Sequence, residues 1–151
     1  MVTFDVAGYE LHGDRLYDPE THMWVALGDG ARARIGIDPL GRETSGDVVA
    51  LSLRVPPAQI ERGGPFGDLE AAKFVGPLIS PVSGTMTAGN PDVLADPGLL
   101  NADPGVHWLV ELELDPAAAT ELDDLLQGEE HVAPWFAAEV ERFRKQGAIA
   151  E

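Results

Sequence analysis

Short runs of strand-forming residues separated by glycine and proline occupy the first two-thirds of the chain, and they most constrain its fold. His22 to Leu27 and Ala31 to Ile37 flank Gly28-Asp29-Gly30, a spacing typical of a β-hairpin. Asp47 to Leu53 predicts another strand, which stops before Pro56-Pro57. The pattern therefore predicts a mainly β fold for this part of the chain.

Further strands are predicted around the middle of the chain. Phe66 to Ala72 and Leu78 to Met86 are expected to form strands on either side of Lys73. Trp108 to Leu114 alternates apolar and acidic side chains, the pattern of a half-buried strand. Asp38 to Gly46 is expected to form a loop or one helical turn.

The end of the chain changes to helical patterns. One helix is predicted from about Ala117 to Leu126, and a second from about Ala133 to Gln146. The second has one apolar face, so we expect it to pack on the strand core, with docking to a partner as the alternative. The predicted organisation is a carrier domain over residues 1–128 and a helical extension over 129–151. The apolar face is made by Val132, Phe136, Val140 and Phe143.

Charge and cysteine content exclude several function classes. The 151 residues include 10 basic and 26 acidic side chains, a net charge of −16, which disfavours nucleic acid and anionic membranes as partners. The chain has no cysteine, so disulfides, thiol nucleophiles and cysteine metal sites are excluded. The N-terminus lacks the pattern of a signal peptide and no apolar run is long enough to span a membrane, so we expect a soluble, cytoplasmic protein.

Motifs of self-sufficient enzymes are missing from the sequence. There is no glycine-rich phosphate loop and no Gly-x-Ser-x-Gly elbow. The four histidines, His12, His22, His107 and His131, lack the spacing of a helical zinc site, so no metal site is expected. These observations predict a protein without catalysis of its own.

Lys73 is the residue that stands out chemically. Lysine occurs twice, at Lys73 and Lys145, and lysine can be acylated whereas arginine cannot under ordinary conditions. Strand-like runs bracket Lys73 and Gly76-Pro77 follows it, so it is expected at an exposed hairpin tip. Such a position suits an enzyme that must modify one amine; the alternative is an ordinary solvated lysine in a turn.

Three segments in this order resemble the H-protein family of the glycine cleavage system. They are Gly64-Pro65-Phe66, Glu70-Ala71-Ala72-Lys73 and Ser80-Pro81-Val82-Ser83-Gly84. His22-Met23-Trp24-Val25 is similar to the family's His-Glu-Trp-Val segment, and the resemblance covers roughly Leu16 to Leu126. Biotin carriers fit less well because they place methionines on both sides of the lysine.

The resemblance implies a barrel-sandwich hybrid of the lipoyl-domain (hammerhead) type with C-terminal helices, acting as a swinging-arm carrier. In this family the lysine three residues after the glutamate carries lipoate, so Lys73 is expected to be an N6-lipoyllysine and Glu70 to be recognised by the lipoylating enzyme. The loaded arm is expected to rest in a cleft on the carrier. The cleft residues are expected to be Thr21, His22, Met23, Trp24, Phe74 and Pro77.

The partners implied by the resemblance are enzymes that load, use or reoxidise the arm. A lipoate ligase or lipoyl transferase would attach lipoate. Glycine decarboxylase, aminomethyltransferase and dihydrolipoamide dehydrogenase would then be visited in turn, so that the arm supplies each site at high effective concentration.

Two departures from the family leave a second cargo open. A cationic aminomethyl cargo needs carboxylate or hydroxyl acceptors, but Met23 and Pro77 stand where the family has acidic residues. Thr21 keeps a hydroxyl there, and Glu20 or Asp18 are candidate substitutes. The alternative is an H-like lipoate-binding protein that carries sulfur for a heterodisulfide-reductase-like complex in sulfur oxidation. A degenerate, unlipoylated binding protein is the other alternative, against which the intact lysine segment argues.

Overall fold

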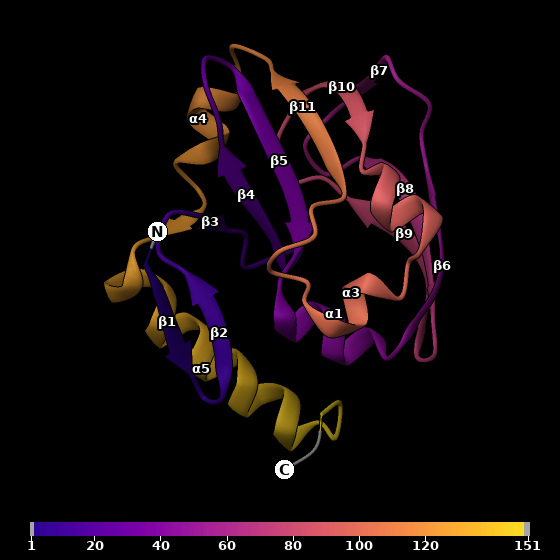
Figure 1. Cartoon of the computed structure of the whole chain (residues 1–151). Coiled ribbons are helices and arrows are strands. Elements are labelled where there is room, and N and C mark those ends of the chain that lie inside the picture. Colours follow the sequence, from indigo (N-terminus) through magenta and orange to yellow (C-terminus); the bar gives the residue numbers. More distant parts are fainter. Residues whose placement is uncertain (1, 150–151) are drawn as a thin grey trace.

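The computed structural model describes residues 2–149, and most of its regular elements are β-strands (Figure 1). The mainly β fold predicted from the sequence, with helices towards the C-terminus, is confirmed. The strands are β1 Thr3–Val6, β2 Tyr9–His12, β3 Leu16–Tyr17, β4 Met23–Leu27, β5 Arg32–Ile37, β6 Val48–Leu53, β7 Ala58–Ile60, β8 Pro65–Ala71, β9 Phe74–Ile79, β10 Gly84–Gly89, β11 Val110–Leu114 and β12 Leu126–Gln127. The helices are α1 Pro39–Ser45, α2 Pro91–Ala95, α3 Leu99–Ala102, α4 Ala118–Leu122 and α5 Glu129–Lys145.

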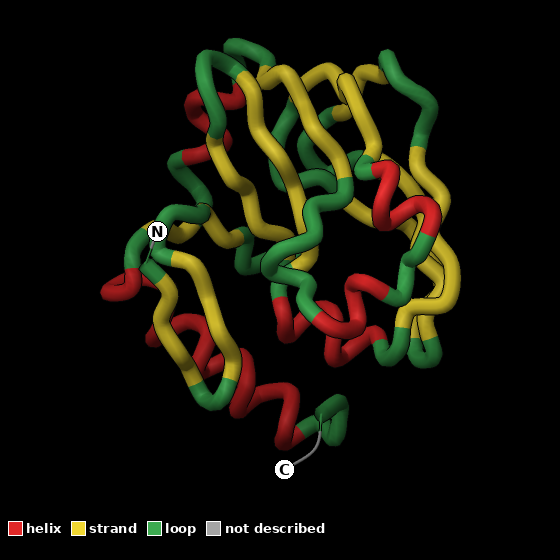
Figure 2. The backbone as a smooth tube through the Cα atoms, viewed as in Figure 1, coloured by secondary structure: helices red, strands yellow, loops and turns green. Residues whose placement is uncertain are grey.

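A seven-stranded sheet forms one side of the molecule. Its strand order is β12-β3-β4-β5-β11-β10-β7. Figure 2 shows strands as yellow tubes, several of them side by side in the upper part of the molecule. Strands β4 and β5 form the expected antiparallel hairpin, in which Met23 pairs with Ile37 and Leu27 with Ala33. Strand β11 lies between β5 and β10, so segments far apart in sequence are joined by backbone hydrogen bonds.

A second sheet of three strands, in the order β6-β8-β9, carries the hairpin that holds Lys73. Strands β8 and β9 pair antiparallel up to Ala71 and Phe74, and Ala72 and Lys73 form the two-residue connection. In Figure 1 this sheet lies across the molecule from β4 and β5, with α1 and α3 near the bottom between the two.

The main hydrophobic core joins the inward faces of the two large sheets. Leu69, Ala71 and Leu78 from the three-stranded sheet belong to the same buried cluster as Val25 and Ile35 from the seven-stranded sheet. Burial of apolar surface from both sheets is the main term that holds them together. The Lys73 hairpin therefore projects from a packed base.

A second core cluster lies under the long helix α5. The β1–β2 hairpin lies beside α5 in Figure 1, and the two are together called the terminal module here. They bury apolar side chains against each other and against Tyr17 and Trp24. The apolar face expected for the last helix is thus covered within the chain. The boundary at residue 128 stays a prediction. The module's buried members are Phe4, Val6, Leu11, Val132, Phe136 and Val140.

The structure corrects three sequence expectations. The strand predicted over Leu78–Met86 is wrong, because β9 ends at Ile79 and β10 begins at Gly84. Between them Ser80 bonds within the segment: its Oγ donates to the carbonyl of Val82 at 2.6 Å, so the chain leaves one sheet before entering the other. The helix predicted up to Leu126 ends at Leu122, and the β1–β2 hairpin was not predicted.

Candidate functional site

The turn that carries Lys73 is held by backbone hydrogen bonds from a neighbouring segment. The Lys73 N–H donates to the Ser45 carbonyl at 2.8 Å, and the Ala72 N–H donates to the Asp47 carbonyl at 3.0 Å. The Lys73 side chain is exposed. The backbone of the lysine is therefore fixed while its amine remains accessible to a large partner.

Gly46 allows the two segments to approach. Its φ of +80° is a conformation that L side chains rarely adopt, and a Cβ there would lie 3.1 Å from the Lys73 nitrogen. Asn101 supports the segment from the other side: its Oδ1 accepts from the Val48 N–H at 2.7 Å, and its Nδ2 donates to the Val48 carbonyl at 3.3 Å.

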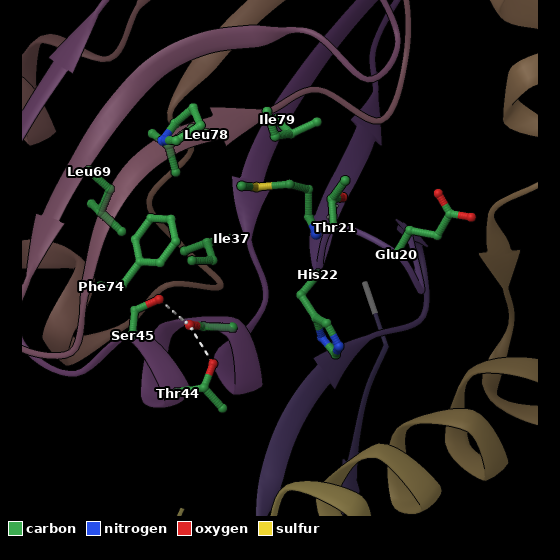
Figure 3. A pocket seen from close by; sticks show the side chains of 13 residues that line it. Glu20, Thr21, His22, Ile37, Thr44, Ser45, Leu69, Phe74, Leu78 and Ile79 are labelled. Atoms are coloured by element: carbon green, nitrogen blue, oxygen red, sulfur yellow. Dashed lines mark hydrogen bonds between the residues drawn. The ribbon is translucent and has the colours of Figure 1, made fainter. Parts of the chain in front are cut away.

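A cleft of about 490 Å³ opens beside this turn (Figure 3). One wall comes from β8 and β9, the other from the segment before β4, and α1 borders it. Leu69 and Phe74 face the opposite wall in Figure 3, so the interior is mainly apolar. The apolar lining residues are Met23, Ile37, Leu69, Phe74, Pro77, Leu78 and Ile79.

The polar groups of the cleft are mostly hydroxyls that donate their protons elsewhere. Ser45 Oγ and Thr44 Oγ1 both donate to the Gly41 carbonyl, at 2.8 and 3.2 Å (Figure 3). Thr21 Oγ1 donates to Asp18 Oδ2 at 2.7 Å and accepts from the Met23 N–H at 3.3 Å, which leaves it one free lone pair. A hydroxyl that donates in one direction keeps lone pairs free, so these oxygens can accept hydrogen bonds from a cation or amine.

The two candidate substitute carboxylates differ in their placement. Asp18 is buried and uses its oxygens for the Thr21 hydroxyl and the Glu20 N–H. Glu20 is the one acidic side chain among the residues that line the cleft, within the described part of the chain, but its carboxylate points away from Phe74 and Leu69 (Figure 3).

The structure brings together most of the residues predicted for the cleft. Thr21, Met23, Phe74 and Pro77 line it. His22 also borders it, but its ring points away from the apolar walls towards α5 (Figure 3). The cleft residues Thr44 and Ser45 were missed, although Gly41, Thr44 and Ser45 stand at helical spacing.

Trp24 is not brought to the cleft. It follows Met23 on a strand, so the two side chains point to opposite faces of the sheet. The Trp24 ring lies in the second core cluster, where its Nε1 donates to the Pro104 carbonyl at 3.2 Å and the Arg15 guanidinium stacks 3.8 Å from the ring centroid. Glu70 is exposed on β8, opposite Val75.

His22 has unusual electrostatics for a residue beside an apolar cleft. Its Nδ1 lies 2.7 Å from Asp38 Oδ2, and its Nε2 lies 3.0 Å from Glu139 Oε1. Burial lowers the pKa of the imidazole, but the hydrogen bonds and charges of Asp38 and Glu139 outweigh it, so the pKa of His22 is raised. The charged imidazolium, which donates from both nitrogens, is favoured.

Within residues 2–149, no group of three or more histidine, aspartate or glutamate side chains is arranged to hold a metal ion. No helix in the same part of the chain is long and apolar enough to cross a membrane.

Comparison with known proteins places the chain in a family. The model of the family described as "Glycine cleavage H-protein" matches residues 15–135. The "Glycine cleavage system H protein" of Mycobacterium avium (strain 104) is 41% identical over 101 residues, which are 66% of this chain and 76% of that protein. The "Glycine cleavage system H protein 4" of Aquifex aeolicus (strain VF5) is 33% identical over 133 residues, or 87% of this chain and 75% of that protein.

A solved structure agrees with these sequence matches. The crystal structure of a glycine cleavage system H protein from Mycobacterium marinum aligns with a TM-score of 0.69 and 27% identity. The alignment covers 86% of this chain and 99% of that one, which confirms the fold expected from the resemblance. The chain belongs to the glycine cleavage H-protein family.

Proposed function

We propose that this protein is the lipoyl-bearing carrier of a glycine cleavage system, with lipoate in amide linkage to Lys73 Nζ. The observation that carries the proposal is the exposed lysine on a fixed two-residue turn, at the residue where the family's attachment motif predicts it. An exposed amine on a rigid hairpin can enter the active site of another enzyme while the rest of the carrier stays outside.

The residues beside the turn fit a lipoyl group. The arm is a flexible apolar chain that ends in a dithiolane, and the walls formed by Leu69, Phe74 and Leu78 offer an apolar surface for it. A volume of about 490 Å³ lies within the usual range for sites that bind small molecules. Bound lipoate supplies the sulfur atoms that accept the cargo and change redox state, and the protein binds, shields and presents them.

In this proposal the chain performs no catalysis and depends on partners. A lipoate ligase or lipoyl transferase attaches the arm, and the exposed Glu70 on the same hairpin is a contact for that enzyme. Glycine decarboxylase, aminomethyltransferase and dihydrolipoamide dehydrogenase then use the arm. The relatives' names, all of them glycine cleavage H proteins, support this set of partners.

The polar groups of the cleft support an amine cargo. Met23 and Pro77 carry no charge, so a cationic amine must be bound by other acceptors. The hydroxyls of Thr44 and Ser45 donate their protons to the Gly41 carbonyl, so the lone pairs of both oxygens remain free to accept hydrogen bonds from the amine. Thr21 adds a third hydroxyl on the opposite wall.

The proposal predicts that Lys73→Arg abolishes lipoylation and carrier activity completely while the midpoint of thermal unfolding stays the same, since the side chain is exposed. Lys145→Arg is the matched control, because it changes the other lysine of the chain, on the exposed end of α5, and should leave both unchanged. The mass of the intact protein after incubation with a lipoate ligase reports the modification.

Carrier activity is measured as glycine–bicarbonate exchange with glycine decarboxylase, using protein shown by mass to be fully lipoylated. Exchange at a rate comparable to that of an established H-protein is the expected result. A normal mass gain in Lys73→Arg would refute the attachment site. No exchange from the fully lipoylated protein would refute glycine cleavage and leave sulfur transfer as the role of the arm.

A further inference from the structure

The terminal module extends beyond the part of the chain that matches the family model. The match covers residues 15–135, so β1, β2 and the second half of α5 lie outside it. These segments pack on each other: the Tyr9 and Phe136 rings meet edge to face with centroids 5.5 Å apart. The Tyr9 hydroxyl also donates to the Glu43 carboxylate of α1, next to the cleft.

One side chain of α5 contacts His22, a residue at the border of the arm cleft. Glu139 Oε1 lies 3.0 Å from His22 Nε2, and the His22 ring lies near the rings of Trp135 and Phe143, at centroid distances of 5.3 and 5.8 Å. Arg142 fixes the rotamer of Glu139 by donating to both of its oxygens, at 2.8 and 2.9 Å. The carboxylate is thus aimed at the imidazole by its own helix.

His22 joins one wall of the cleft to helix α1, which borders it. Its neighbours Thr21 and Met23 line one wall. Its Nδ1 contacts Asp38, and its carbonyl accepts from the Asp38 N–H at 2.8 Å. Asp38 is the N-cap of α1, with its Oδ1 accepting from the Gly41 N–H at 2.8 Å, and α1 supplies the border of the cleft.

The backbone of His22 shows that this arrangement is imposed by its surroundings. Its φ is +58°, a conformation that a residue with a Cβ rarely adopts and that costs free energy. Such a residue keeps this conformation only when its contacts hold it there. Here those contacts are the backbone hydrogen bonds from the His22 N–H to the Asp18 carbonyl and from the Asp38 N–H to the His22 carbonyl. The Asp38 and Glu139 carboxylates and the two aromatic rings from α5 add to them by holding the imidazole.

We propose that Glu139 is a positioning residue, through which α5 holds His22 in place. His22 in turn fixes the distance between the Thr21–Met23 wall and α1, and that distance lets the cleft accept the lipoyl arm. The proposal rests on the proposed function for the identity of the arm. Its claim about the shape of the cleft concerns this chain's own residues and can be tested without the arm.

The first test uses unlipoylated protein and follows the methyl signals of Met23 and Thr21 by NMR. We expect Glu139→Ala to shift both signals and Glu139→Gln, which can still accept a hydrogen bond from His22, to shift them less. Glu141→Ala is the matched control, an exposed glutamate on the same helix. Unchanged Met23 and Thr21 signals in Glu139→Ala would overturn the proposal.

The second test uses protein lipoylated at Lys73 and measures how fast a small phosphine reduces the dithiolane. In Glu139→Ala the rate should rise towards that of free lipoamide, by up to roughly tenfold, the factor that loss of one charge-assisted hydrogen bond can produce. Val140→Ala removes a buried side chain of the same helix and lowers stability without touching His22, so its reduction rate should stay at the wild-type value.

The two tests separate this proposal from the proposed function. If Lys73 is not lipoylated, the proposed function fails, and the methyl signals still decide whether Glu139 positions the cleft. An equal rise of the reduction rate in Glu139→Ala and Val140→Ala would show a merely structural role and overturn the proposal. If Glu139→Ala does not fold, Glu139→Ser, whose short side chain cannot reach His22, is measured in its place, and unchanged signals in that variant overturn the proposal.

Discussion

The Lys73 hairpin and the terminal module place their apolar side chains in opposite ways. Around Lys73 the sheet β6-β8-β9 leaves Val75 77% and Val49 63% exposed, and Phe74 39% exposed. In the terminal module the comparable side chains Phe136 and Val132 are only 0% and 1% exposed. Backbone hydrogen bonds hold the tip of the Lys73 hairpin, while Leu69 and Leu78 at its base are buried in the main core. The terminal module is held by packing over most of its length.

The same substitution in the two regions should therefore have different costs. Phe136→Ala is expected to lower the free energy of unfolding by about 3–5 kcal/mol, because it removes a fully buried ring from the second core cluster. Phe74→Ala should cost about 1 kcal/mol or less, since the ring is partly exposed. Urea denaturation of both variants measures the difference, and similar values for the two would break the comparison.

Gly46 and Gly63 share a backbone conformation that L side chains rarely adopt, but Gly46 alone of the two touches the Lys73 turn, so comparing them isolates the effect of that contact. Gly46→Ala and Gly63→Ala both place alanine at a φ near +80°, which should cost about 1–3 kcal/mol of unfolding free energy in each. The new Cβ at position 46 would press on Ala72 and Lys73, whereas a Cβ at position 63 would have no atom within 4 Å. The rate of lipoylation should fall in Gly46→Ala and not in Gly63→Ala. Equal rates would mean that the turn does not depend on this contact.

The smallest expected effect is a pH dependence at His22, where the terminal module meets the border of the cleft. The pKa of His22 is raised in the folded protein, so its contribution to stability is full below the ordinary histidine value of about 6.5 and is lost as the pH rises through the folded-state pKa. The charged groups that face the ring are Asp38 from the start of α1 and Glu139 from α5, with Arg142 bound to Glu139.

Unfolding free energies of the wild type and of His22→Gln, measured from about pH 6 to about pH 9, check this effect. The difference between them should shrink as the pH rises, and an NMR titration of the His22 ring should give a midpoint above the ordinary value. A difference that grows with pH would contradict the sign of the linkage.

The exposed turn that carries Lys73 was predictable because its signals are local. Glu70, Lys73 and Gly76-Pro77 lie within one hairpin, and the residues that make a turn are the ones that specify it. The strand expected over Leu78–Met86 failed for the complementary reason. Its apolar residues belong to two sheets, and periodicity alone does not show where a chain changes sheets.

The cleft was only partly predictable. Thr21, Met23, Phe74 and Pro77 follow from the family's motif, whereas Thr44 and Ser45 lie in a segment expected to be a loop or a single turn. The β1–β2 hairpin was missed because its strands are four residues each and its buried side chains find their partners on α5, at the other end of the chain.

The sequence by itself determined the exposed position of Lys73, its turn and the family, because each depends on residues that are close together in the chain. The tertiary structure alone decided that His22 points out of the cleft and meets Glu139, 117 residues away in sequence. Packing of α5 on the second core cluster creates that contact. The physical reason is that turn geometry is a property of a few consecutive residues, whereas a buried ion pair exists only after distant elements have packed.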